Sequence, residues 1–199
     1  SYLYEETLHN WQKWLASGVQ IESSNPHLDY VWRVSKSLLK MSLQKNGLMV
    51  YIGYWKYQGM VWIRDNVWVA IVLAKIGYPK ESLQILRGLK KIIKKDADGY
   101  IYCAYNSRTG ENTEDIDTRE KDFAGLLLTG IWYCYQFLRK IEVLKEFWGL
   151  VEYCADWICK ARDDTGMITP CAGIWEDFCP RRNLEYEHMT WTSGVSAFG

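Results

Sequence analysis

Apolar residues recur every three or four positions along most of this chain, which is the spacing of amphipathic α-helices. The first stretch places Leu8, Trp11 and Leu15 on one stripe and is followed by Gly18. Glycine and proline separate later stretches, as at Gly77-Tyr78-Pro79. The pattern predicts helices over residues 2–17, 27–45, 65–76, 79 to about 95, 119–139 and 142–161, and one more that begins near Glu187. Short connections between successive helices indicate antiparallel hairpins, so we expect an all-α fold.

A glycine turn followed by a short apolar stretch recurs between the predicted helices. The three copies are Asn46-Gly47-Leu48-Met49, Asp98-Gly99-Tyr100-Ile101 and Thr165-Gly166-Met167-Ile168. We expect each glycine to close the preceding helix in the left-handed conformation. An acidic residue follows each copy at Asp65, Asp122 or Glu176. Such a unit cannot bury its apolar face alone, so the repeat predicts a solenoid or a closed barrel of helical hairpins.

Composition narrows the class of protein. Lys plus Arg balance Asp plus Glu at 24 each, so no basic excess indicates a nucleic-acid partner. Eleven Trp and fourteen Tyr favour a ligand cleft lined with rings in addition to an aromatic core. The six cysteines form no CxxC pair and the three histidines lie far apart, so we expect no metal site.

The ends of the sequence suggest location and completeness. The polar, acidic segment at residues 1–6 is not a secretory signal, and no apolar run has membrane-spanning length. We therefore expect a cytoplasmic protein without a membrane partner. Because Ser1 replaces an initiator methionine, we expect the chain to be an excised piece. Cys171 and Cys179 could form a disulfide in an oxidising compartment, and the sequence leaves this open.

Two short strings carry candidate chemistry, Trp62-Ile63-Arg64-Asp65 and Gly173-Ile174-Trp175-Glu176-Asp177. Each places an indole beside a carboxylate, and the first adds a guanidinium. Indole faces suit pyranose rings, and Arg and Asp offer donors and acceptors to sugar hydroxyls. A carboxyl group can protonate a glycosidic oxygen. The strings therefore point to a sugar-processing cleft.

These motifs resemble the catalytic domain of glucoamylase-type enzymes, glycoside hydrolase family 15, in its bacterial and archaeal form. Trp62-Ile63-Arg64-Asp65 resembles the Trp-x-Arg-Asp signature, with Ile63 where these members often have Pro. Gly173-Ile174-Trp175-Glu176 resembles the Gly/Asp-Leu-Trp-Glu motif, and residues 188–193 resemble the start of the next helix. The order and spacing of the motifs carry the resemblance, which runs from end to end of the chain.

The resemblance implies a fold of helical hairpins arranged as an (α/α)6 toroid that is incomplete in this chain. We expect residues 1–20 to form a linker and first helix, and residues 21–199 to form the N-terminal half of the barrel. The resemblance places the second carboxylate, which acts as general base, in the other half.

The resemblance also implies residue roles. Glu176 is the expected general acid, and Arg64 and Asp65 hold the non-reducing terminal sugar. Partial burial beside Trp175 would raise the pKa of Glu176 and keep it protonated. The expected substrate-binding residues are Tyr57, Trp62, Arg64, Asp65, Glu120, Asp122, Trp175 and Asp177.

Each acidic candidate also has an ordinary structural interpretation. Glu176 could be a surface glutamate, although the Gly-Ile-Trp before it favours catalysis. Arg64 and Asp65 could be an ion pair that opens a helix, with Asp65 near the N-cap. Asp122 could equally be a solvated acid at a helix start.

We expect the full-length protein to be an inverting, exo-acting glycosidase on α-glucosides, with an oligosaccharide or disaccharide substrate and no cofactor. One alternative is a trehalase or another α/α-toroid sugar enzyme, and another is a non-catalytic glucan-binding or regulatory module. Inversion needs an acid and a base on opposite faces of the sugar ring, so we expect the 199-residue chain alone to be inactive. Its incomplete barrel faces could associate with one another. The linkage preference depends on variable loops that the sequence does not identify.

Overall fold

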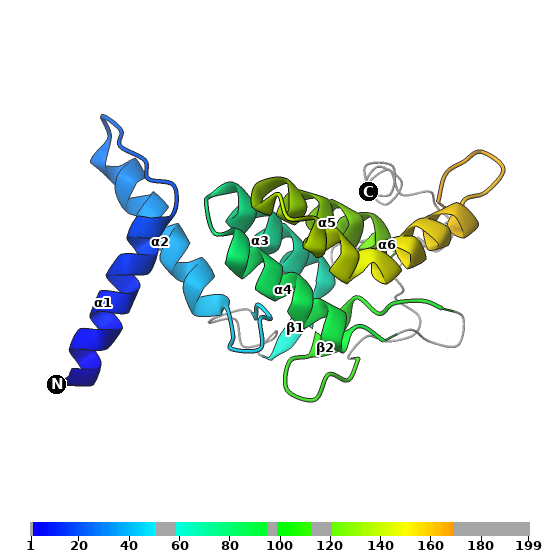
Figure 1. Cartoon of the computed structure of the whole chain (residues 1–199), viewed down its shortest axis with the longest axis horizontal. Helices are drawn as coiled ribbons and strands as arrows, with labels where there is room; N and C mark the ends of the chain where they lie inside the picture. Colours follow the sequence, from blue (N-terminus) through cyan, green and yellow to red (C-terminus); the bar gives the residue numbers. More distant parts are fainter. Residues whose placement is uncertain (1, 51–58, 95–98, 113–120, 169–199) are drawn as a thin grey trace, which may run out of the picture.

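The computed structural model describes residues 2–50, 59–94, 99–112 and 121–168 (Figure 1). In these ranges the helices are α1 (Tyr2–Ser17), α2 (Pro26–Ser42), α3 (Ile63–Lys75), α4 (Pro79–Ile92), α5 (Phe123–Leu138) and α6 (Ile141–Ala161). One short antiparallel pair, β1 (Met60–Trp62) with β2 (Ala104–Asn106), accompanies them. Helices α1 and α2, α3 and α4, and α5 and α6 pack as successive hairpins. The predicted all-α class is therefore confirmed, and the described part is a segment of an α/α toroid.

The helix ends differ from the prediction where the chain enters an extended segment. Helix α2 ends at Ser42 because Leu43 leaves the helix to pair with Met49. Helix α3 begins at Ile63 rather than Asp65, directly after strand β1. Helix α5 begins at Phe123, and the helix predicted near residue 187 lies outside the described residues.

The core lies among α3, α4 and α5, and α6 covers α5 (Figure 1). Helix α3 contacts both α4 and α5, so apolar residues surround most of its circumference. Fully buried members of this core include Ile63, Val67, Ile71, Leu86, Leu89, Phe123, Leu126 and Phe147. Each such side chain contributes about 1.5–3 kcal/mol of burial free energy. Cys134 and Cys154 are buried free thiols.

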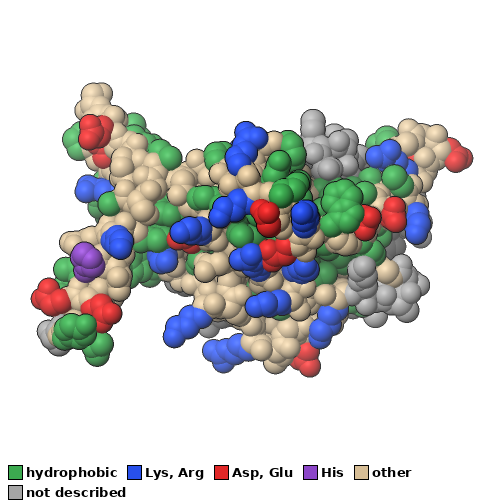
Figure 2. All heavy atoms as spheres, in the orientation of Figure 1, with side chains coloured by type: hydrophobic (Ala, Val, Ile, Leu, Met, Phe, Trp, Pro, Cys, Tyr) green, Lys and Arg blue, Asp and Glu red, His purple; other side chains and the backbone are tan. Residues whose placement is uncertain are grey.

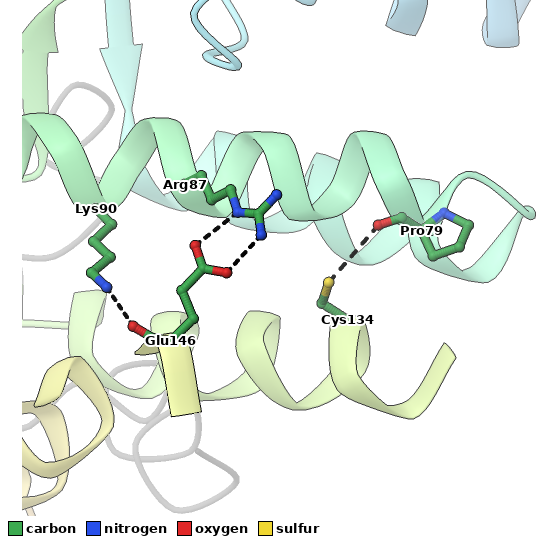
Figure 3. A network of polar contacts seen from close by, with 5 residues as sticks. All are labelled: Pro79, Arg87, Lys90, Cys134 and Glu146. Atoms are coloured by element: carbon green, nitrogen blue, oxygen red, sulfur yellow. Dashed lines mark hydrogen bonds and ion pairs between the residues drawn. The ribbon is translucent and has the colours of Figure 1, made fainter. Parts of the chain in front are cut away.

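A polar network joins α4 to the last hairpin at the edge of this core (Figure 3). The Arg87 guanidinium donates to both carboxylate oxygens of Glu146, at 2.7 Å each. This contact lowers the pKa of the Glu146 carboxyl below its usual value. Lys90 donates to the backbone carbonyl of Glu146, and the Cys134 sulfur lies 3.9 Å from the Pro79 carbonyl oxygen. Helix α4 is thus tied to both helices of the α5–α6 hairpin.

Two of the three glycine repeats form the same small hairpin turn. Gln44 N–H donates to Leu48 O at 2.8 Å, and Gly47 N–H donates to Gln44 O at 3.0 Å. The equivalent bonds after α6 join Asp163 to Met167 and Gly166 to Asp163, both at 2.9 Å. The repeat and its left-handed glycines, with φ of 89° at Gly47 and 80° at Gly166, are confirmed.

The predicted place of these glycines relative to the helices is wrong. Helices α2 and α6 end instead at Leu43 and Arg162, whose backbones are extended. Each glycine turns the chain a few residues later, within the hairpin that brings Leu43 to Met49 and Arg162 to Ile168. The helix therefore ends at a residue with an extended backbone, and the glycine turn then reverses the direction of the chain.

Helices α1 and α2 extend away from the core (Figure 1). Trp14 of α1 stacks on Tyr78 of the α3–α4 turn, with ring centroids 4.1 Å apart, and donates to Glu81 at 2.7 Å. Tyr78 in turn donates to the Trp14 carbonyl at 2.9 Å. Figure 2 shows apolar side chains at the free end of α1, where Tyr2 and Leu3 are 80% and 73% exposed. Helix α1 is thus anchored at one end.

Lys36 joins α1 to α2. Its ammonium, on a side chain that is buried within the hairpin, donates to the carbonyls of Leu15 at 2.9 Å and Val19 at 3.2 Å. Leu15 lies in the last turn of α1, where carbonyls have no partner within the helix, and Val19 follows the helix. Burial lowers the pKa of Lys36, and the carbonyl contacts together with the helix dipole compensate for the desolvation.

Candidate functional site

The first predicted sugar-binding string lies at the junction of strand β1 with helix α3. Trp62 is both the last strand residue and the N-cap of α3, with an extended backbone. Its neighbours Val61 and Ile63 are fully buried, and Ile63 N–H donates to Cys103 O at 2.8 Å. Trp62 pairs with Ala104 in the β1–β2 ladder. The short ladder thereby fixes the point at which α3 begins.

Asn66 fixes this junction from the other side. Its buried side chain accepts from Met49 N–H at 2.7 Å and donates to Met49 O at 3.0 Å and to Trp62 O at 2.9 Å. The glycine-turn hairpin that follows α2 is thus joined to the first turn of α3. Sequence reasoning missed Asn66, although an amide on the buried stripe with Ile63, Val67 and Ala70 is a signal for such a buried hydrogen-bonding role.

Arg64 forms an ion pair with Asp122, which lies at the start of α5. Arg64 Nε donates to Asp122 Oδ2 at 2.7 Å, and the two side chains are only 13% and 3% exposed. Helices α3 and α5 pack together, so their N-terminal ends meet at this pair. Two residues predicted to serve one sugar site are therefore brought together by the fold.

Asp65 occupies the third position of α3 rather than the N-cap, which is Trp62. Asp65 therefore lies in the first turn of α3, near the N-cap as the structural interpretation expected. A carboxylate in the first turn is still stabilised by the helix dipole. Asp122 precedes α5, yet its side chain makes no capping bond to that helix; it binds Arg64 instead.

The arrangement offers polar groups of both signs at one place. Two carboxylates, Asp65 and Asp122, lie at the N-terminal ends of α3 and α5, with the Arg64 guanidinium between the two helices. Carboxylates accept hydrogen bonds from hydroxyls, and guanidinium groups donate them. Trp62 is partly exposed at the same junction. This combination can bind a polyol ring.

The remaining predicted site residues fall outside the part of the chain that the structure describes. Tyr57, Glu120, Trp175, Glu176 and Asp177 lie outside the described residues, so their roles stay predictions. Within the described ranges, no group of three His, Cys, Asp or Glu side chains could hold a metal ion. Nor is any helix in those ranges long and apolar enough to cross a membrane.

Comparison with known proteins identifies a family match for the segment that contains the Arg64–Asp122 pair. Residues 27–131 match the family described as glycosyl hydrolases family 15. This segment contains Trp62, Arg64, Asp65 and Asp122. A trehalase from Thermoplasma acidophilum is 30% identical over 138 residues, which cover 63% of this chain and 22% of the trehalase. The chain therefore matches less than a quarter of that relative's length.

Proposed function

Since the chain belongs to glycosyl hydrolases family 15, we propose that its full-length protein is an inverting, exo-acting glycosidase that releases glucose from α-glucosides. The observation that carries the proposal is the buried Arg64–Asp122 pair at the meeting point of α3 and α5, inside the matched segment. It holds a sugar-binding guanidinium at the end of a rigid helix. Sites on such elements keep their geometry better than sites on loops.

In the proposed mechanism Arg64 and Asp65 bind hydroxyls of the terminal glucose, and Trp62 and Trp175 lie against its apolar face. Glu176 donates a proton to the glycosidic oxygen as the bond to C1 breaks. A second carboxylate, elsewhere in the full-length protein, removes a proton from the attacking water. Inversion places the two carboxyl groups about 6.5–9.5 Å apart, with the water between the base and the sugar.

The other proposed substrate contacts are close in sequence to these groups. Tyr57 precedes strand β1, Glu120 precedes Asp122, and Asp177 follows Glu176. Such residues would select the linkage and the length of the substrate. Trehalose is a second candidate substrate because the T. acidophilum relative is a trehalase. Maltose, isomaltose and trehalose therefore form the set of substrates to compare.

The decisive experiment is Glu176→Gln in the full-length protein. Loss of a general acid costs about 10²–10⁴-fold in rate, and we expect kcat to fall by that factor while binding of a non-hydrolysed disaccharide analogue is retained. Glucose release and calorimetric binding are the measurements. Nuclear magnetic resonance of the first product should show the β-anomer, since an α-linkage is inverted.

The matched control is Glu152→Gln, which removes an exposed carboxylate from α6 and should leave kcat unchanged. Normal turnover by Glu176→Gln would contradict the assignment of the acid. Sugar binding without any hydrolysis by the wild type would instead identify a glucan-binding module.

A further inference from the structure

We propose that Asp122 is a positioning residue, which acts on the substrate through Arg64 rather than by touching the sugar itself. This inference rests on the proposed function, because it concerns how the sugar-binding guanidinium is oriented. The ion pair joins a residue of α3 to the residue that precedes α5, and Arg64 has the more exposed of the two side chains.

A positioning role requires Asp122 to be less exposed than Arg64, and this is the case. The Asp122 side chain is 3% exposed, whereas that of Arg64 is 13% exposed. A ligand that approaches the pair from solvent therefore meets Arg64 first. The contact uses Arg64 Nε, and a bond at this atom sets the orientation of the whole planar guanidinium, whose donors point in fixed directions.

Asp122 is well placed to hold its partner because its backbone is fixed. Asp122 O accepts from Leu126 N–H at 3.1 Å, which begins helix α5. The next residue, Phe123, is fully buried and packs against Tyr100 and Trp157, with ring centroids 5.5 Å and 4.7 Å away. A carboxylate on this rigid start of a helix can fix Arg64 within the small tolerance that a binding site requires.

The conformation of Asp122 supports the same role. Aspartate directly before a helix commonly caps the first turn with its carboxylate. Here the side chain makes no capping bond and turns to a residue of another helix, 58 positions earlier. The carboxylate lies at the N-terminal end of α5. The local cap is replaced by a tertiary contact.

A double-mutant cycle separates positioning from direct contact. In the full-length protein with maltose, isomaltose or trehalose, Asp122→Asn should lower kcat/KM by about 10–100-fold, because misplaced binding groups cost rates of this order. The fall should appear mainly as a higher KM if Arg64 binds ground and transition states alike. In an Arg64→Ala background the same substitution should have almost no further effect. Losses that multiply in the double variant would overturn the proposal, since Asp122 would then act on the sugar by itself.

Chemical rescue gives a readout that a merely structural role would not affect. Millimolar guanidinium chloride should restore part of the activity of Arg64→Ala, because Asp122 still offers a site for the cation. It should not restore the activity of Arg64→Ala/Asp122→Asn, and sodium chloride at the same ionic strength should restore neither. Equal rescue of both variants would contradict the positioning role.

The control is a second carboxylate that binds arginine far from the junction. Glu146→Gln breaks the Arg87–Glu146 pair shown in Figure 3 and should leave kcat/KM unchanged. An equal loss in this variant would show a general effect of destabilisation and overturn the inference.

A wild-type protein that neither binds nor hydrolyses any of the sugars would contradict the proposed function and remove the premise of the inference about Asp122. If the wild type is active but the losses in the Arg64 and Asp122 variants are additive, this inference alone is contradicted.

Discussion

The side-chain hydrogen bonds of Asn66 within the described residues go to backbone groups, and these groups come from two different segments. Its amide satisfies both the N–H and the carbonyl of Met49 and also the carbonyl of Trp62. Buried backbone groups that lose their partner cost about 1–3 kcal/mol each. One side chain thus stabilises the hairpin after α2 and the start of α3 together.

Asn66→Ala should lower the free energy of unfolding by about 2–4 kcal/mol, because it leaves three buried backbone groups without this partner. Urea denaturation monitored by tryptophan fluorescence measures the change. The matched control, Asn10→Ala on the exposed surface of α1, removes an amide without burial and should change stability by less than about 0.5 kcal/mol. A loss in Asn66→Ala no larger than in the control would contradict the role of the amide.

Local spacing gave candidate residues for the chemistry but did not indicate which of them meet. Arg64 and Asp65 are neighbours in sequence, so an ion pair at the helix start was a natural interpretation. The partner that the fold provides for Arg64 is Asp122, a helix-start residue from the following hairpin. Such a pairing depends on how α3 packs against α5, and periodicity within either helix contains no information about it.

Among the elements, the helices were the most predictable because their apolar stripes extend over several turns. The ends of the helices were less predictable, since extended segments and hairpin turns compete with the last helical turn.

Helix α5 also shows a feature that an apolar stripe does not reveal. A Cβ atom at Gly130 would lie 2.9 Å from Val67 Cγ1 of α3 and 3.3 Å from Leu86 Cδ2 of α4, so the glycine permits three helices to approach closely.

Gly130→Ala should therefore destabilise the protein even though alanine favours helices. We expect a loss of about 1–3 kcal/mol from overpacking, which outweighs the helix propensity gained, and a lower midpoint of thermal unfolding. Gly149→Ala on α6 is the matched substitution, because a Cβ there meets nothing within 4 Å. It should raise stability by up to about 1 kcal/mol. A stabilising Gly130→Ala would show that the helices adjust without strain.

At the scale of the whole molecule, the described residues form three hairpins that pack in chain order, and polar contacts hold them together at their edges. The Arg87–Glu146 pair joins the second hairpin to the third, and Trp14 joins the first to the second. Short turns predicted the hairpins, and the resemblance to glycoside hydrolase family 15 implied the toroid class. It did not predict that α1 and α2 project from the core. The division into residues 1–20 and 21–199 stays a prediction.

The stability of the whole chain should depend on pH through Glu146. Because Arg87 lowers the pKa of this carboxyl in the folded state, its contribution is present above its unfolded pKa, about 4.3. The contribution is lost as the pH falls through the lower folded value. For a partly exposed pair it amounts to at most about 1 kcal/mol. Urea denaturation of wild type and Glu146→Gln between pH 7 and pH 3 should show a stability difference that is constant above about pH 5 and shrinks toward zero in acid. A difference that does not vary with pH would refute this linkage.

The β1–β2 ladder has a consequence for the order of events in folding. Its strands are separated in sequence by the entire α3–α4 hairpin, and three residue pairs alone cannot offset the entropy of closing so long a loop. Once α3 and α4 have paired, their outer ends are already close and most of that entropy has been lost. We therefore expect the ladder to close after the helical hairpin has formed. Trp62 and Arg64 would then reach their final positions late, so the proposed sugar site would form only when the surrounding helices are in place.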